Sequence, residues 1–180
     1  MKTKTTKKSP KMRSNSAAAK VPRDASRQLL RHTVATLAYR GGKAIRDVPS
    51  GFPDFRIGDA TRSPAQILAH IGDLLDWALS LAQGKEKWRN SKPLAWDLGV
   101  ERFFAALRAF DDFLSSPRPL GHSLERLFQG PIADSLTHVG QISMLRRLAG
   151  APVRGENYNR AEIAAGRVGP QQSPANFEFD

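Results

Sequence analysis

The stretch SPAQILAHIGDLLDWALSLAQG, residues 63–84, carries the clearest helix signals in the chain. Ser63 and Gln66 form a Ser-x-x-Gln capping box, and a proline stands between them at the first helical position. Gly84 is typical of a residue just beyond a helix end. Apolar residues recur at helical spacing between these signals, at Ile67, Ile71, Leu74, Ala78 and Leu81. The segment therefore predicts an amphipathic helix with one buried stripe.

Three further segments show a helical pattern, at about residues 24–45, 94–115 and 122–150. The last of them is interrupted at Gly130-Pro131. No segment alternates polar and apolar residues as a half-buried strand does. Long helices with wide apolar faces bury them best against one another, so we expect an all-α fold, an antiparallel four-helix bundle over residues 24–150. We expect residues 151–180 to form a C-terminal extension with a short helix around 160–165.

The net charge of +11 is concentrated at the N-terminus. Residues 1–23 contain eight Lys and Arg residues and no acid, which leaves 20 basic and 17 acidic residues in the rest of the chain. Because large apolar residues are scarce there, we expect a disordered basic tail. Other interpretations of this segment are that it contacts nucleic acid or an anionic surface, or that it is an organellar targeting segment. The lack of an apolar run disfavours a secretory signal.

The residue inventory excludes several classes of function. The chain has no cysteine, so disulfides, thiolate metal sites and a cysteine nucleophile are ruled out. The motifs of phosphate loops, dinucleotide-binding folds, serine hydrolases and HExxH metalloproteases are also absent. No stretch approaches the roughly 20 apolar residues of a membrane span. We expect a soluble, cytoplasmic protein without a membrane partner.

A line of polar residues on the last predicted helix suggests a metal site. Asp134, His138 and Gln141 lie at positions i, i+4 and i+7, on a helix that is otherwise largely apolar. Residues four apart lie one above the other on a helix face, so Asp134 and His138 are placed to bind one ion. The alternative is a partly solvated helix edge without a ligand.

His70 is the candidate third ligand, on the helix of residues 63–84. Two histidines and one carboxylate suit a divalent metal such as Ni, Zn, Fe or Mn and leave positions open for water or substrate. The alternative is a half-buried histidine that is hydrogen-bonded to Asp73 or to a backbone carbonyl. We interpret His32 as a surface or half-buried residue and His122 as a local helix cap.

The element His138-Val139-Gly140-Gln141, together with a single histidine on the second helix, resembles the DinB/YfiT-like superfamily of four-helix bundles. The resemblance covers about residues 24–150. It implies a divalent metal held by three histidines, one on the second helix and two spaced by four on the fourth. His70 matches the first of these and His138 the last, whereas Asp134 stands where a histidine is expected. Val139 replaces a frequent arginine.

Several members of that superfamily resemble transferases or isomerases that use low-molecular-weight thiols such as bacillithiol or mycothiol. The resemblance thus favours a metal-dependent transferase or hydrolase that activates a thiol or water against a small-molecule substrate. Gln141 is expected to orient a ligand or substrate, or else to be a buried hydrogen-bonding partner. Trp77 and Trp96 are candidates to line the pocket, with the core as the alternative place for both. A non-catalytic bundle that binds partners or forms a homodimer is the alternative, because the last helix is apolar on nearly all sides. Nucleic-acid association through the tail ranks last.

Overall fold

Helices make up most of the regular structure in the computed structural model, which describes residues 23–179. The all-α prediction is therefore confirmed. The predicted tail, residues 1–23, lies outside the described residues except for Arg23, which begins α1. The long helices are α1 (Arg23–Ile45), α2 (Pro64–Ala82), α3 (Trp96–Ser115) and α5 (Ala133–Leu148). The short elements are the 3-10 turn η1 (Phe52–Asp54), α4 (Leu124–Leu127), the π-helical turn η2 (Phe128–Ile132), β1 (Gly155–Glu156) and β2 (Glu178–Phe179).

The start of α2 confirms the predicted capping box. The hydroxyl of Ser63 accepts a hydrogen bond from the backbone N–H of Gln66 (3.4 Å), and the side-chain oxygen of Gln66 accepts one from the backbone N–H of Ser63 (3.0 Å). Beyond the other end of α2, Gly84 has the left-handed conformation, with φ of 70°. Local signals therefore set both ends of the helix that carries His70.

The long helices share one core of aliphatic and aromatic side chains. Its largest fully buried members include Leu37, Ile71, Leu75, Phe103, Phe110 and Ile142. Gly41 permits the close approach of α1 to α3, because a Cβ atom there would lie 2.5 Å from the ring of Phe103. Contacts of α1 with α3 and of α2 with α5 complete the packing around the core.

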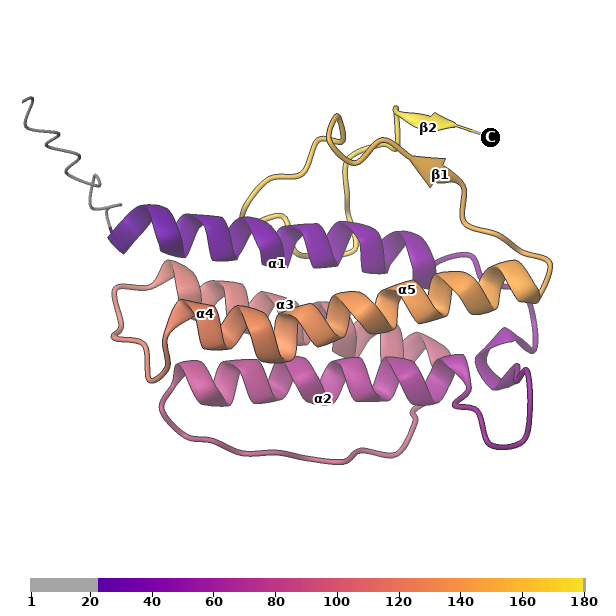
Figure 1. Cartoon of the computed structure of the whole chain (residues 1–180), viewed down its shortest axis with the longest axis horizontal. Coiled ribbons are helices and arrows are strands. Elements are labelled where there is room, and N and C mark those ends of the chain that lie inside the picture. The colour runs from indigo at the N-terminus through magenta and orange to yellow at the C-terminus, as the bar shows by residue number, and fades with distance from the viewer. Residues whose placement is uncertain (1–22, 180) are drawn as a thin grey trace, which may run out of the picture.

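The helix directions correct the prediction of an all-antiparallel bundle. Gly99 of α3 packs on Leu68 of α2, and Arg102 packs on Gly72 one turn later, so α2 and α3 run parallel. Residues 83–95 return along the length of α2 before α3 begins (Figure 1). Thirteen residues span up to about 43 Å when extended, more than the roughly 28 Å length of a 19-residue helix. The connection is thus long enough to bring the chain back to the start of α2, so that α3 begins there and runs parallel to α2. No local sequence pattern excludes such a crossover.

The predicted interruption at Gly130-Pro131 is a π-helical turn rather than a break. Pro131 has no backbone N–H and cannot continue a regular α-helical ladder. The chain instead widens into η2, and α4, η2 and α5 follow one another as a single rod (Figure 1). The turn lies directly before Ala133, so it sets the rotation of the helix that carries Asp134 and His138.

The predicted short helix in the C-terminal extension is wrong. Residues 160–165 form turns, and the extension crosses over α1 to pair β1 with β2 in an antiparallel register (Figure 1). A helix of one or two turns is marginal because its first turn is costly to nucleate. The segment is held instead by Glu156, a buried carboxylate that accepts hydrogen bonds from Tyr39 (2.7 Å) and Lys43 (2.8 Å) of α1.

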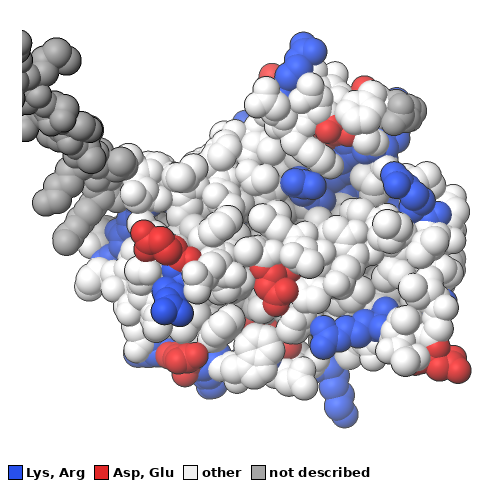
Figure 2. Space-filling model, in the orientation of Figure 1, with Lys and Arg blue, Asp and Glu red and all other residues white. Residues whose placement is uncertain are grey.

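The described part of the chain has no helix long and apolar enough to cross a membrane. On the face in Figure 2, Lys and Arg side chains are interspersed with acidic ones and with wide uncharged areas. Nucleic-acid association through residues 1–23 stays a prediction, since residues 1–22 lie outside the described part.

Candidate metal centre

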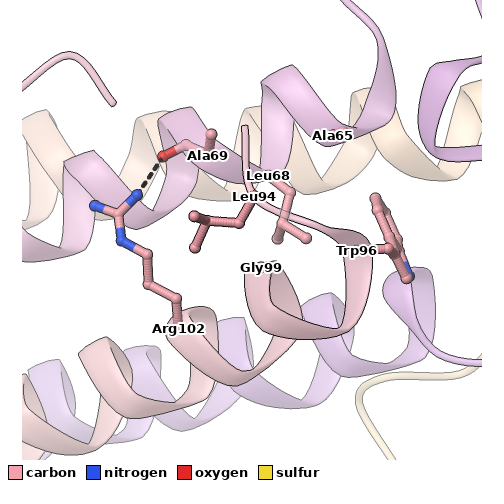
Figure 3. Close-up of a pocket in the computed structure, with 7 residues that line it drawn as sticks. All are labelled: Ala65, Leu68, Ala69, Leu94, Trp96, Gly99 and Arg102. Carbon is pink, nitrogen blue, oxygen red and sulfur yellow. Dashed lines mark hydrogen bonds between the residues drawn. The ribbon is translucent and has the colours of Figure 1, made fainter. Parts of the chain in front are cut away.

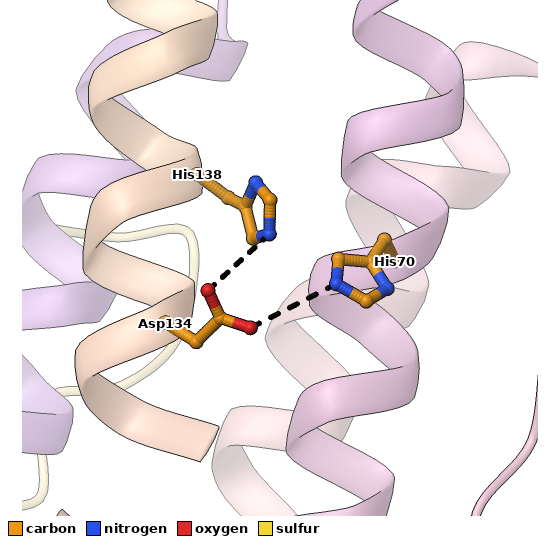
Figure 4. Close-up of side chains that lie close together, drawn as sticks. All are labelled: His70, Asp134 and His138. Atoms are coloured by element: carbon orange, nitrogen blue, oxygen red, sulfur yellow. Dashed lines mark ion pairs between the residues drawn. The ribbon is translucent and has the colours of Figure 1, made fainter. Parts of the chain in front are cut away.

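The structure brings the three predicted metal ligands together across the α2–α5 contact. His70 projects from α2, and Asp134 and His138 project from successive turns of α5 toward it (Figure 4). Each carboxylate oxygen of Asp134 faces the ring of a different histidine. Oδ1 of Asp134 lies 3.5 Å from Nε2 of His138, and Oδ2 lies 3.9 Å from Nε2 of His70. One ligand atom from each residue falls within 4.8 Å of the others.

These separations are typical of donor atoms around an ion rather than of direct hydrogen bonds. Both are beyond the roughly 3.2 Å limit of a good hydrogen bond. Ligands bound tetrahedrally at about 2.1 Å lie about 3.4 Å from one another. The His138–Asp134 pair already has this spacing, and the three donor atoms together lie within 4.8 Å of one another.

The centre lies on a seam between the two helices and is open on one side. The side chain of His138 is 11 % exposed and that of His70 20 %, whereas the Asp134 carboxylate is 48 % exposed. The two rings meet edge to face, with centroids 4.7 Å apart. The imidazoles are thus held by packing, and the carboxylate side leaves room for further ligands from solvent.

Gln141, the predicted supporting residue, contacts the ring of His138. Nδ1 of His138 donates a hydrogen bond to the side-chain oxygen of Gln141, at 2.8 Å. A carbonyl oxygen only accepts, so Nδ1 is the donor in this contact. The other ring nitrogen, Nε2, faces Asp134. Such a partner for the second ring nitrogen is a usual feature of metal-binding histidines.

His70 is kept neutral by its surroundings. Burial lowers the pKa of its imidazole, and the neighbouring His138 and Arg62 lower it further, against the opposing effect of Asp134. A neutral ring is the form that binds a metal ion. The alternative partner for His70, Asp73, is engaged elsewhere: its carboxylate accepts hydrogen bonds from the backbone N–H (2.8 Å) and the hydroxyl (2.6 Å) of Ser91.

The sequence missed one aromatic residue of the site. Trp88 lies in the crossover connection and meets His70 edge to face, with ring centroids 5.7 Å apart. Trp77, a predicted pocket residue, also meets Trp88 edge to face, with the same centroid distance. Trp96 is not part of the site, because it packs on Phe52 and donates a hydrogen bond to a carbonyl of Ile45. No periodicity marks a residue in an irregular connection, and hence no pattern pointed to Trp88.

The other two histidines stand apart from the centre. His32 and His122 are exposed, as expected of residues without a ligand role. His122 is not the predicted cap, since the hydroxyl of Ser123 accepts the hydrogen bond from the backbone N–H of Arg126.

A small hollow between α2 and α3 is separate from the metal centre. It is lined by Leu68, Trp96 and Arg102 among others, and Arg102 crosses it to donate a hydrogen bond to the carbonyl of Ala69 (Figure 3). Its volume of about 10 Å³ holds about one water molecule. It is too small for an organic substrate, and none of the candidate metal ligands lines it.

Comparison of the chain with protein-family models, curated proteins and solved structures finds no match.

Proposed function

We propose that this protein binds one divalent metal ion through His70, Asp134 and His138. The observation that carries the proposal is their convergence from two helices, with both carboxylate oxygens facing imidazole nitrogens at 3.5 and 3.9 Å. Two imidazoles and a carboxylate are a common ligand set for Ni, Zn, Fe or Mn, and the carboxylate offsets part of the dication's charge.

We further propose that the ion serves catalysis, in a transferase or hydrolase that activates a low-molecular-weight thiol or water. Three protein ligands leave positions for further ligands, and the exposed side of Asp134 gives solvent access to them. A bound divalent ion lowers the pKa of a coordinated thiol or water and so generates the nucleophile near neutral pH. The protein's part is to fix both rings, with their Nε2 atoms on the side of Asp134.

The resemblance to the DinB/YfiT-like superfamily supports this function, and we propose that the chain is a divergent member. The two histidines that match the superfamily pattern are the two that meet here. Asp134 supplies the third donor atom from the position of the missing histidine. A small-molecule thiol is accordingly the co-substrate we propose first, and a cytoplasmic location fits the use of such thiols.

Metal content tests the first part of the proposal. We expect protein purified without chelators, or reloaded with Zn²⁺ or Ni²⁺, to bind one ion per chain. His70→Ala and His138→Ala should each lower the metal affinity at least about 100-fold, because two protein ligands remain. His32→Ala and His122→Ala are matched controls and should keep wild-type affinity. Equal metal retention by all four variants would contradict the assignment.

Titration of the Co²⁺-loaded protein tests the second part. A thiol that binds as thiolate adds a sulfur-to-cobalt charge-transfer band to the spectrum, whereas water or hydroxide does not. We expect the band on addition of a low-molecular-weight thiol, and its loss in His138→Ala. A spectrum that no thiol alters would favour water activation, and hence a hydrolase.

Self-association is a second candidate function, favoured by one observation on α5. Met144 and Leu148 lie one turn apart and are 55 % and 53 % exposed, an unusual place for two large apolar side chains. We propose that this face joins two copies of the chain. Sedimentation at several concentrations tests it: a dimer that Met144→Glu weakens supports the contact, and a monomer at all concentrations contradicts it.

A further inference from the structure

We propose that Trp88, backed by Trp77, is a binding platform for the organic part of a ligand held at the metal centre. The ligand class is a small molecule with an anionic metal-binding head and a planar, aromatic body. This inference rests on the proposed metal site and adds a substrate-binding residue and a substrate class to it.

Trp88 is the most exposed of the three tryptophans, and it lies beside a candidate metal ligand. Its side chain remains 47 % exposed although it packs edge to face on both His70 and Trp77. A tryptophan in a surface connection loses favourable burial unless something covers it. The partly exposed indole contacts a candidate metal ligand, so a molecule bound at the centre is placed to cover it. Tryptophan is suited to this role because its large, rigid surface binds planar groups at little entropic cost.

The crossover holds Trp88 in place from both sides. The backbone N–H of Lys87 donates a hydrogen bond to the hydroxyl of Ser80, at 3.1 Å. Three residues after Trp88, Ser91 binds the buried carboxylate of Asp73 through its N–H and its hydroxyl. The ring is thus fastened to α2 one residue before and three residues after itself. Such preorganisation lowers the entropic cost of binding and distinguishes a built surface from a loose loop.

The platform is within reach of a metal-bound ligand. An ion about 2.1 Å from Nε2 of His70 lies about 3 Å from the centre of that ring. The centroid of Trp88 lies 5.7 Å from the same ring centre. The two lengths together place the indole at most about 9 Å from the ion. A ring attached directly to the metal-binding group can therefore reach the indole.

The net charge of the metal site indicates which metal-binding group the ligand has. The indole of Trp88 indicates what the rest of the ligand is. A dication bound by one carboxylate and two neutral imidazoles keeps one net positive charge, which favours an anionic donor. Arg62 adds positive charge near His70. The indole has no charge to pair and attracts a flat apolar ring by stacking.

Two hydroxamates that differ only in the body test the inference. Acetohydroxamate and benzohydroxamate present the same anionic head to a metal ion, and only the second has a ring. We expect the Co²⁺-loaded protein to bind benzohydroxamate about 3- to 10-fold more tightly, as followed by the cobalt spectrum and calorimetry. Trp88→Ala should remove this preference and leave metal content and acetohydroxamate affinity unchanged, whereas Trp88→Phe should keep most of it.

Each other result has a distinct meaning. Equal affinity of the wild-type protein for the two hydroxamates, or an unchanged preference in Trp88→Ala, would overturn the platform and leave the metal site standing. Loss of metal from Trp88→Ala with an unchanged helical circular dichroism spectrum would also overturn it, because Trp88 would then act by supporting His70. A wild-type protein that binds no metal would overturn the platform together with the proposed function.

Discussion

Asp134 is the residue on which the chemistry of the centre depends most. It is the most exposed of the three candidate ligands, and it alone offers an oxygen donor. Imidazole binds Ni²⁺, Cu²⁺ and Zn²⁺ well, whereas a carboxylate broadens the set toward Mn²⁺ and Fe²⁺. We infer that Asp134 sets both the metal preference and the net charge of the site.

Replacement of Asp134 by histidine tests this reading at the residue scale. We expect Asp134→His to raise the affinity for Ni²⁺ relative to Mn²⁺ about 10-fold or more, because a nitrogen donor replaces an oxygen donor and one negative charge is lost. Asp134→Ala should weaken the binding of both Ni²⁺ and Mn²⁺. The measurement is competition between the two ions, followed by metal analysis after desalting. An unchanged Ni²⁺ to Mn²⁺ ratio in Asp134→His would exclude Asp134 from the ligand set.

At the scale of elements, the crossover is tied to the helices by Asp73. Its carboxylate is buried on α2 and accepts hydrogen bonds from Ser91 of the crossover and from Arg102 of α3 (2.7 Å). Burial opposes its ionisation, but the hydrogen bonds from Ser91 and Arg102 outweigh burial and lower the pKa of Asp73. The ionised form therefore stabilises the parallel α2–α3 pair and holds the connection that carries Trp88.

The depressed pKa of Asp73 fixes the direction of its pH dependence. Its contribution to stability is fully present above the unfolded-state value of about 3.9 and is lost as the pH falls through the lower folded-state value. We expect Asp73→Asn to lower the free energy of unfolding by about 2–3 kcal/mol at pH 7, and by less at pH 3. Urea unfolding at the two pH values measures both.

Asp76 provides the matched control, because it binds the same Arg102 nitrogen at 2.7 Å but its side chain is 40 % exposed. Asp76→Asn should cost less than about 1 kcal/mol, as an exposed ion pair does. Equal losses in the two variants would show that the Asp73 carboxylate does not hold the crossover. Tryptophan fluorescence provides an independent readout, since release of the connection exposes Trp88 further.

At the scale of the whole molecule, the C-terminal extension is anchored to α1 through a buried ion-pair cluster. Glu156 and Glu178, one on each of the two short strands, both bind the buried ammonium group of Lys43, at 2.8 and 2.7 Å. Removal of one partner from such a cluster leaves a buried charge poorly compensated, which typically costs about 3–5 kcal/mol. The extension is thus part of the folded unit.

Substitution of Glu156 tests that anchoring. We expect Glu156→Ala to lower the free energy of unfolding by about 3 kcal/mol, near the lower end of that range because Glu178 still binds Lys43. The exposed Glu162 of the same extension is the control, and Glu162→Ala should change stability by less than about 0.5 kcal/mol. Thermal and urea unfolding give both values. A Glu156→Ala protein as stable as Glu162→Ala would mean that the extension is not anchored there.

The sequence predicted what local patterns determine. Capping residues and apolar periodicity located all four long helices, and the i, i+4 spacing of Asp134 and His138 placed two ligands on one face. Helix direction was mispredicted, because it depends on the path of a 13-residue connection rather than on any helix pattern. Contacts between residues far apart in the sequence could not be predicted either, because they depend on how the helices are arranged. Arg146 of α5, for example, donates hydrogen bonds to carbonyls at the end of α1.

The most direct test of the central claim is a crystal structure of the protein soaked with Zn²⁺ or Ni²⁺, with anomalous diffraction data collected at the metal edge. We predict one strong anomalous peak in the seam between α2 and α5, about 2.0–2.2 Å from Nε2 of His70, Nε2 of His138 and a carboxylate oxygen of Asp134. Anomalous peaks only elsewhere, with the three side chains still 3.5 Å or more apart, would contradict the assignment of this site.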